Sequence, residues 1–287
     1  MKAADFVYHR ANSIEEAVGH LAEHEGAARI LAGGQSLMPM LNMRLWRPSA
    51  LIDINGLVEL DRVQPSGDET VVGAMVRYVT LERSPLVAER LPLLARMVRF
   101  IGDRQVRNRG TLGGSLVQGD PTGEMPLGCL VLGARVRVAG PDGPREIPMT
   151  EFYSGPYAAT LEAGELLTEV VFPRHPQHFA FREFCRRHND FAVLSIAVTG
   201  DVSSDGGWRN IQLGLGGVND TPLLVTGMTA RLEGSRLTDA DIAAAGEAVL
   251  GVIDPSSDIR ASAEYRRHLA PIYVRRVLQD LRSSLQN

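Results

Sequence analysis

Apolar and polar positions alternate in the first part of the chain so that short strands and helices are expected in turn. Residues 13–16 read as a capping box, and apolar residues follow at helical spacing up to Gly26. Residues 28–32 and 51–54 are apolar runs typical of buried strands, with a short helix or turn expected between them. The pattern predicts a strand–helix–strand unit whose connection starts at the C-terminal end of a strand, where α/β proteins tend to bind ligands.

The middle of the chain mixes both kinds of element. Residues 57–80 are expected to form β-structure around a turn at Gly67-Asp68, and residues 86–100 have a helical period that Pro92 divides or kinks. A helix is expected at residues 121–132. Strands are expected at residues 70–74, 135–138 and 166–172.

The last third has a simpler order, in which strands come first and helices follow. Three strands are expected, at residues 179–186, 191–202 and 211–218. Turns are expected at Gly206-Gly207 and at Gly214. Helices are expected at residues 238–250 and 263–285, and Pro271 should interrupt the second of them.

The segment Pro-Arg-His-Pro at residues 173–176 is the best candidate for a domain boundary. We therefore expect a first domain at residues 1–176, with subdomains at about 1–57 and 58–176. A second domain at residues 177–287 should be a small antiparallel sheet with helices on one face. The expected fold class is α+β.

Composition narrows the class of protein. The 287 residues are 44% apolar and 22% charged, as in ordinary soluble domains, and can bury a sizeable core. A net charge of -4 argues against nucleic-acid binding, which normally needs a basic face. The N-terminus lacks the apolar core of a secretory signal, and no stretch is apolar and long enough to cross a bilayer. A cytoplasmic location is expected, unless a partner carries the chain to a membrane.

Two glycine segments share a pattern of paired glycines with a hydroxyl residue at or near the end. Paired glycines let the main chain approach a ligand closely, and two sets of N–H groups could surround one diphosphate. We expect both segments to hold the pyrophosphate of a dinucleotide, FAD in our hypothesis, although GxGxxG is absent. The segments are Ala32, Gly33, Gly34, Gln35 and Ser36, and Thr111, Leu112, Gly113, Gly114 and Ser115.

Longer stretches around both segments resemble a known family. Residues 32–39, followed by Arg44, are similar to the first FAD motif of the flavoprotein subunits of molybdenum hydroxylases, and residues 101–115 are similar to the second. This family includes the medium subunit of aerobic carbon-monoxide dehydrogenases and the FAD domain of xanthine dehydrogenases. The likeness covers the whole chain, including residues 186–192. It implies a two-subdomain FAD-binding domain of the vanillyl-alcohol-oxidase/PCMH type, followed by the C-terminal domain of this family.

The resemblance also implies roles for single residues. Glu124 stands where relatives usually carry an aspartate that contacts the flavin, so the carboxylate is kept with a longer reach. Ile101 and Leu167 match positions that line the flavin pocket. Arg182 and the Arg186-Arg187 pair match a basic segment beside the flavin, and the resemblance leaves open which of these side chains reaches it. No catalytic residue and no metal ligand is implied for this chain.

The implied function is electron transfer within a complex. A molybdenum cofactor on a large partner subunit oxidises the substrate, and electrons pass through two [2Fe-2S] clusters on a small partner to the FAD of this chain, then to an external acceptor. Two copies of each of the three subunits would form a heterohexamer, a dimer of heterotrimers. Cys129 and Cys185 have no CxxC partner, so we expect them to be reduced structural thiols and any metal to belong to another chain.

Several residues have an alternative interpretation. Arg104, Arg107 and Arg109 form either a docking face for a partner or a solvated basic face. Asp120 and Glu124 could act as an acid–base pair, but this role is disfavoured, because the flavin of the resembling family only relays electrons. 

Three aromatic or imidazole side chains allow similar alternatives. His188 is either a proton donor to the flavin or a surface histidine. Tyr153 and Tyr157 are expected to be packing residues rather than a stacking pair for the flavin.

Two other functions compete with the subunit hypothesis. The chain could be a self-sufficient flavin oxidoreductase, which would need a substrate pocket in the C-terminal domain, where the sequence offers no polar constellation. It could also be a flavin-free assembly scaffold, although both glycine segments are intact. Turnover without partners would favour the first, and a colourless protein that cannot be reconstituted would favour the second.

Overall fold

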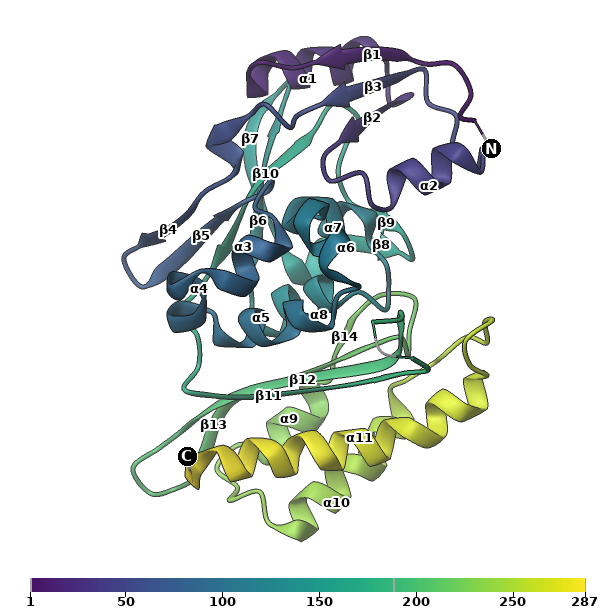
Figure 1. Cartoon of the computed structure of the whole chain (residues 1–287). Helices are drawn as coiled ribbons and strands as arrows, with labels where there is room; N and C mark the ends of the chain where they lie inside the picture. The colour runs from purple at the N-terminus through teal and green to yellow at the C-terminus, as the bar shows by residue number, and fades with distance from the viewer. Residues whose placement is uncertain (1, 188, 287) are drawn as a thin grey trace.

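The computed structural model describes residues 2–187 and 189–286, and the fold has three layers stacked along one long axis (Figure 1). A three-stranded sheet lies at one end, a five-stranded sheet and a group of helices lie in the middle, and a four-stranded sheet backed by helices lies at the other end. His188 lies outside the described residues, so the structure does not address the hypothesis of a proton donor there.

The first layer is a parallel sheet in the order β1-β3-β2. Its register places Ala50 of β3 between Val7 of β1 and Ala28 of β2. The predicted strand–helix–strand unit is confirmed, because α2 connects two strands that pair in parallel. The bounds are β1 (Val7–Arg10), α1 (Ile14–Glu23), β2 (Ala28–Leu31), α2 (Leu37–Asn42) and β3 (Ala50–Asp53).

The second layer contains an antiparallel sheet in the order β4-β5-β10-β6-β7. Its strands are β4 (Val63–Ser66), β5 (Glu69–Gly73), β6 (Arg135–Gly140), β7 (Gly143–Pro148) and β10 (Leu166–Phe172). A small pair, β8 (Tyr153–Gly155) and β9 (Ala158–Ala159), lies beside it. The strands expected near residues 70–74, 135–138 and 166–172 are therefore confirmed.

Six helices pack beside this sheet (Figure 1). Pro92 divides the predicted helical stretch as expected, because α4 ends before it and α5 starts at it. The β-structure expected up to residue 80 ends earlier, since Tyr78 and Leu81 are buried at helical spacing on α3. The helices are α3 (Tyr78–Arg83), α4 (Pro85–Arg90), α5 (Pro92–Met97), α6 (Arg104–Arg109), α7 (Leu112–Gln118) and α8 (Glu124–Val131); the 3₁₀ turns are η1 (Val58–Leu60), η2 (Val98–Phe100) and η3 (Met149–Glu151).

The third layer is an antiparallel sheet in the order β11-β12-β13-β14, with α9 to α11 on its outer face (Figure 1). This arrangement confirms the predicted α+β fold with helices on one face of a C-terminal sheet. The elements are β11 (His178–Cys185), β12 (Ala192–Val202), β13 (Trp208–Gly216), β14 (Leu223–Leu224), α9 (Thr226–Leu232), α10 (Asp239–Ala248), α11 (Ala263–Ser283), η4 (Val249–Gly251) and η5 (Ser284–Gln286).

Two predictions for this layer are wrong. Gly214 does not form a turn but lies inside β13, where a Cβ atom would come 2.5 Å from Cγ2 of Val131 on α8, so glycine permits the close packing of helix on sheet. Pro271 does not interrupt the last helix, because α11 runs through it with one buried face held against the sheet. Packing of that face outweighs the single N–H bond that proline removes.

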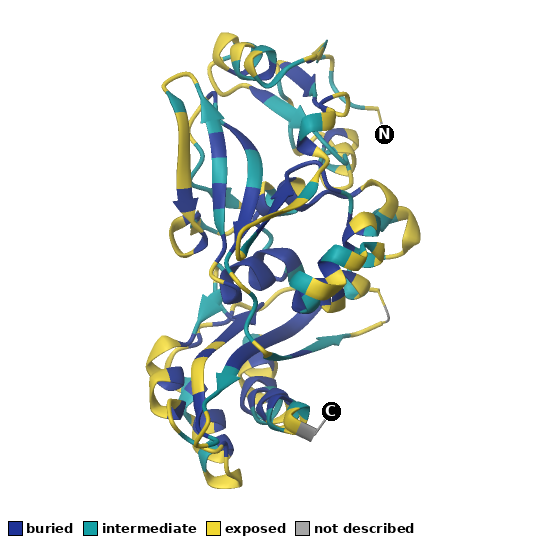
Figure 2. Ribbon diagram, turned by 90° about the vertical axis from the view of Figure 1, so that its left-hand side faces the viewer, coloured by how far each residue is buried: buried dark blue, intermediate teal, exposed yellow. Residues whose placement is uncertain are grey.

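The inner face of the third layer joins the apolar core of the second. Phe181 of β11 and Ala197 of β12 belong to the same buried cluster as α5 and α8, and the rings of Phe100 and Phe181 meet edge-on at 5.0 Å. Figure 2 shows buried strands at the centre of this layer and exposed residues on its outer helices. In the described part of the chain, no helix is both long and apolar enough to cross a bilayer.

Candidate cofactor-binding site

The two glycine segments lie side by side. A side chain on Gly33 would overlap the carbonyl oxygen of Arg109, and its Cβ would lie 2.9 Å from Cα of Gly110. A Cβ on Gly114 would lie 3.9 Å from that of Ala32. Glycine at position 33 is therefore needed for the approach of one main chain to the other. The structure brings together the two segments that the sequence separates by more than seventy residues.

The first segment presents a row of free main-chain donors at the end of β2. Among the described residues, no acceptor is bonded to the N–H groups of Gly34, Gln35 or Ser36, whereas the N–H of Met38 binds the Gly34 carbonyl at 3.0 Å. Gly34 has a φ of 71°, a left-handed conformation that glycine adopts without strain. Consecutive N–H groups in such a turn form a concave anion-binding surface. This segment fits a diphosphate.

The second segment differs from the expected loop. Thr111 caps helix α7 through a 3.2 Å bond from the N–H of Gly114 to its Oγ1, so both glycines lie in the first turn of the helix and neither has a positive φ. Gly113 is needed for packing, because its Cβ would come 2.6 Å from Cβ of Ala74. Gly114 is exposed, and a Cβ on it would meet only Oγ1 of Thr111 at 2.7 Å and the Ala32 Cβ already described.

Most donors of the second segment are already used within the chain. The N–H groups of residues 112–115 bind the oxygens of Val76, Ala74 and Thr111. What this segment offers a ligand is the bare Cα surface of Gly114 and the hydroxyl of Ser115, rather than a second set of N–H groups. The two segments therefore have different roles. Residues 33–36 supply N–H donors, and Gly114, which has no side chain, lets a ligand approach the main chain closely.

Asn55 and Arg77 connect the two segments, and sequence reasoning missed both. Nδ2 of Asn55 donates to the carbonyls at the end of β2, Leu31 at 3.2 Å and Ala32 at 3.0 Å. Arg77 donates Nη2 to Oδ1 of Asn55 at 2.6 Å and Nη1 to the carbonyl of Arg109. This relay fixes the distance between the segments. No local motif marks it, because its members are far apart in the sequence.

Glu124 begins α8 and faces Glu183 of β11, a residue that the sequence did not single out. Burial raises the pKa of Glu124 to about 8, and the negative charges of Glu183 and Asp120 add to the effect. Burial also raises the pKa of Glu183 to about 7. Both carboxylate oxygens of Glu183 are buried without a hydrogen-bond partner among the described residues. Near neutral pH the pair therefore retains a proton.

The remaining residues expected to contact the flavin lie in different parts of the structure. Ile101 is half-buried beside the core, and Leu167 lies within the core with 3% of its surface exposed. Arg182 donates Nε to Asp280 of α11 at 2.5 Å, on the outer face of the lower sheet, because its side chain alternates with that of Glu183. Arg186 is exposed and donates to the Ile259 carbonyl at 3.1 Å. The structure does not bring Arg182 to the glycine segments.

The structure decides between the alternative roles considered for Arg107 and Tyr153. Arg107 is not part of a free basic face, because its Nε binds Glu82 at 3.0 Å and its Nη1 binds the carbonyls of Ile101 and Gly102. The hydroxyl of Tyr153 donates to the Leu116 carbonyl at 2.9 Å, which is a packing role, as expected. 

The two thiols also differ in their surroundings. Cys129 is buried, and burial raises the pKa of its thiol well above the usual value. Cys185 is half-buried, and burial raises its pKa to about 11. Both therefore remain protonated at neutral pH.

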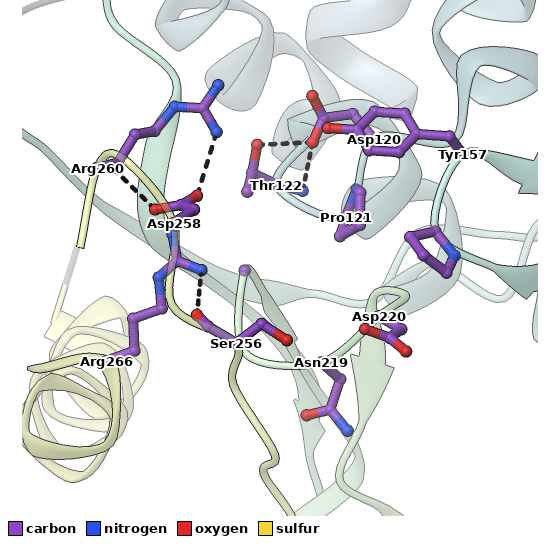
Figure 3. A pocket seen from close by; sticks show the side chains of 12 residues that line it. Asp120, Pro121, Thr122, Tyr157, Asn219, Asp220, Ser256, Asp258, Arg260 and Arg266 are labelled. Carbon is purple, nitrogen blue, oxygen red and sulfur yellow. Dashed lines mark hydrogen bonds and ion pairs between the residues drawn. The ribbon is translucent and has the colours of Figure 1, made fainter. Parts of the chain in front are cut away.

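A cavity of about 170 Å³ opens where residues 120–122 and 156–157 meet the lower layer (Figure 3). Asp120, Tyr157, Asp258 and Arg260 line it, and Oδ1 of Asp120 is held by the N–H and hydroxyl of Thr122. Tyr157 has a φ of 57° and is exposed. Asp120 therefore lies in the wall of this cavity, and its charge also acts on the buried carboxyl of Glu124.

Comparison with known proteins identifies two family matches. Residues 4–175 match the family described as FAD binding domain in molybdopterin dehydrogenase. Residues 179–281 match the family described as CO dehydrogenase flavoprotein C-terminal domain.

Whole-chain relatives agree with these matches. The chain is 38% identical over 278 residues to the nicotine 6-hydroxylase medium subunit of Paenarthrobacter nicotinovorans, covering 97% of this chain and 98% of the relative. It is 36% identical over 275 residues to the carbon monoxide dehydrogenase medium chain of Hydrogenophaga pseudoflava, covering 95% and 96%.

Solved structures show the same architecture. A chain of quinoline 2-oxidoreductase from Pseudomonas putida 86 superposes with a TM-score of 0.94 at 34% identity, covering 99% of both chains. A chain of the Cu,Mo-CO dehydrogenase superposes with a TM-score of 0.95 at 33% identity, again covering 99% of both.

Proposed function

Because this chain belongs to the family of FAD-binding subunits of molybdopterin dehydrogenases, we propose that it holds one FAD against its two glycine segments and relays electrons. It is an oxidoreductase subunit of the carbon-monoxide dehydrogenase and xanthine dehydrogenase type. FAD is the cofactor of this chain, and the molybdenum cofactor and iron–sulfur clusters belong to partner subunits.

One observation carries the assignment of the FAD site: the N–H groups of residues 34–36 have no acceptor among the described residues, and a Cβ on Gly114 would lie 3.9 Å from the Cβ of Ala32, just before them in the chain. The donors match the needs of a diphosphate, and glycine at both positions leaves room for it. Gly33, Gly34, Gln35 and Ser36 hold the phosphates, with Ala32, Gly114 and Ser115 alongside. Asn55 and Arg77 keep the two segments at a fixed separation.

When bound, FAD supplies the chemistry, accepting electrons and passing them to an acceptor. The chain's own residues position that cofactor and control its surroundings. Thr111 and Leu112 anchor the start of α7, Ile101 supplies apolar surface, and Leu167 packs in the core. Glu124 and Glu183 hold a proton in a buried site at the junction with the lower layer.

The assembly and domain organisation form the second part of the proposal. We infer a dimer of heterotrimers with a large molybdenum subunit and a small [2Fe-2S] subunit, working in the cytoplasm. Within this chain, residues 1–176 form the FAD-binding part, with subdomains at about 1–57 and 58–176, and residues 177–287 form the C-terminal part. Arg186, just after the end of β11, remains a candidate contact to the flavin, whereas Arg182 is not one, because its side chain binds Asp280 on the outer face of the lower sheet.

Expression of the chain alone and with its partner subunits tests this proposal. The isolated chain should show flavin absorbance with one FAD per chain and no turnover of the complex's substrate, whereas the assembled complex should turn over. Substrate turnover by the isolated chain would favour a self-sufficient flavin oxidoreductase instead. Size-exclusion chromatography with light scattering of the complex measures its stoichiometry.

A further inference from the structure

Three histidines, none of them assigned to the FAD site, gather around β1 and the C-terminal end of α1. His20 lies in the last turn of α1, and His24, four residues later, is the C-cap residue of that helix. His9 lies on β1 and stacks on His20 with ring centroids 4.1 Å apart. All three rings are half-buried, which leaves each accessible to a small ion.

The ring nitrogens of these histidines have two kinds of neighbour: the Nδ1 atoms of His20 and His24 lie next to other side chains, and the Nε2 atoms of His9 and His24 lie next to each other. Nδ1 of His20 lies 3.0 Å from Oε2 of Glu23, and Nδ1 of His24 lies 3.1 Å from the hydroxyl of Ser49. The Glu23 carboxylate favours a proton on Nδ1 of His20 and leaves its Nε2 lone pair free, whereas the Ser49 hydroxyl can either accept from or donate to Nδ1 of His24. Nε2 of His24 faces Nε2 of His9 at 3.3 Å.

The Nε2 separation fits two ligands of one metal ion. Two imidazole nitrogens at zinc–nitrogen distances of about 2.0–2.1 Å in a tetrahedral site are about 3.3 Å apart. Without an ion, the same contact requires one ring to donate a proton to the other. Nε2 of His20 and the carboxylate Oε1 of Glu16, 3.7 Å from each other, lie next to this pair. Glu16 and Glu23 give the surroundings negative charge, which favours a cation.

We propose that His9 and His24 form the core of a binding site for a divalent late transition-metal ion such as Zn²⁺. His20 or Glu16 completes the site after a side-chain rotation, because no three such side chains already surround one point in the described residues. Imidazole and carboxylate ligands suit this class of metal. The bound ion would join β1 to the C-terminal end of α1, and through Ser49 to the approach to β3.

Calorimetric titration of Zn²⁺ into the full FAD-loaded chain, prepared without a polyhistidine tag, tests the site. We expect one equivalent of Zn²⁺ to bind and to raise the melting temperature, since the ion binds the folded state. His9→Gln and His24→Gln should each weaken binding at least tenfold. His268→Gln, which changes an exposed histidine on α11, should leave binding unchanged.

Electron paramagnetic resonance of the unmodified chain with one equivalent of Cu²⁺ tests the ligands without relying on a variant. At least two imidazole nitrogens are expected around the copper. Fewer than two imidazoles, no bound Zn²⁺ in the wild type, or Zn²⁺ binding that survives both His9→Gln and His24→Gln would overturn the proposal. Intact flavin absorbance in each variant shows that a loss of binding is not a loss of fold.

Discussion

Gly33 lies so close to the main chain of Arg109 that any side chain on Gly33 would overlap the Arg109 carbonyl oxygen. We expect Gly33→Ala to lower the free energy of unfolding by about 1–3 kcal/mol, as overpacking does, and to reduce bound FAD. Thermal melting and flavin absorbance measure the two effects. Gly19→Ala is the matched control, because a Cβ at this exposed helical position meets no atom within 4 Å and should stabilise α1 by up to about 1 kcal/mol.

Gly114→Val should remove FAD while the fold remains. Position 114 is helical, so the effect does not arise from a forbidden backbone angle; the new side chain occupies the open surface beside Ala32. Its Cβ would also lie 2.7 Å from Oγ1 of Thr111, so a loss of about 1 kcal/mol from the disturbed cap is expected. FAD titration should show at least tenfold weaker binding.

Gly113→Ala separates packing from ligand approach in this experiment. Its Cβ would meet Ala74 rather than the open surface, so this variant should lose stability first. Unchanged FAD content in Gly114→Val would contradict the assignment of this surface to the cofactor.

Asn55→Ala should weaken FAD binding although Asn55 touches neither glycine pair directly. The change removes the donor to the Leu31 and Ala32 carbonyls and the acceptor for Arg77. Because these groups are largely exposed, the loss of stability should be only about 1 kcal/mol. Fluorescence titration measures FAD affinity, with Arg62→Ala as a control for loss of an exposed arginine that bonds a local carbonyl.

The relay also predicts coupling between its members. Combining Asn55→Ala with Arg77→Ala should cost less FAD affinity than the sum of the single effects, since each change breaks the same link. Simple additivity would mean that the two residues act independently.

Stability should fall as the pH rises through the neutral range. The folded-state pKa values of Glu183 and Glu124, about 7 and about 8, lie above the ordinary value of 4.5, so the folded state binds more protons than the unfolded state at intermediate pH. The resulting stability is fully present below about pH 4.5 and is lost as the pH rises through 7 and 8. Melting temperatures between pH 6 and pH 9 measure this slope.

Glu183→Gln should flatten that slope, because an amide does not ionise. Glu89→Gln, at an exposed glutamate on α4, should retain the wild-type slope. An identical slope in Glu183→Gln and the wild type would show that the buried carboxylate pair does not set the pH dependence.

The sequence predicts the strands well because their apolar runs are bounded by glycine, proline and charged residues, which are local signals. At Gly214 and Pro271 the neighbouring residues in the sequence give the wrong prediction. The first is explained by Val131 on a helix more than eighty residues away, and the second by a packed face that extends along all of α11. Tertiary packing decides both cases.

At the candidate site, the sequence predicts the two glycine segments. It does not predict that only the first offers free N–H donors, whereas the second begins a helix. Thr111 and Gly114 form a helix start because Ala74 and Val76 accept the next N–H groups, and those partners cannot be read from the segment itself. Glu183 carried one usable signal: it lies two residues after Phe181 and four after Phe179, so it shares the inward face of β11, whereas Arg182 faces α11.

The core shared by Phe181, Ala197 and the helices of the middle layer has a consequence for synthesis on the ribosome. α5 and α8 emerge before β11 and β12 exist, so the part of their apolar surface that packs against these strands is uncovered while translation continues. We therefore expect the nascent FAD-binding part to be prone to aggregation and to need chaperones until the C-terminal sheet has been synthesised and has docked. Since Glu124 meets Glu183 only after the C-terminal sheet has docked, the buried carboxylate pair forms late in folding.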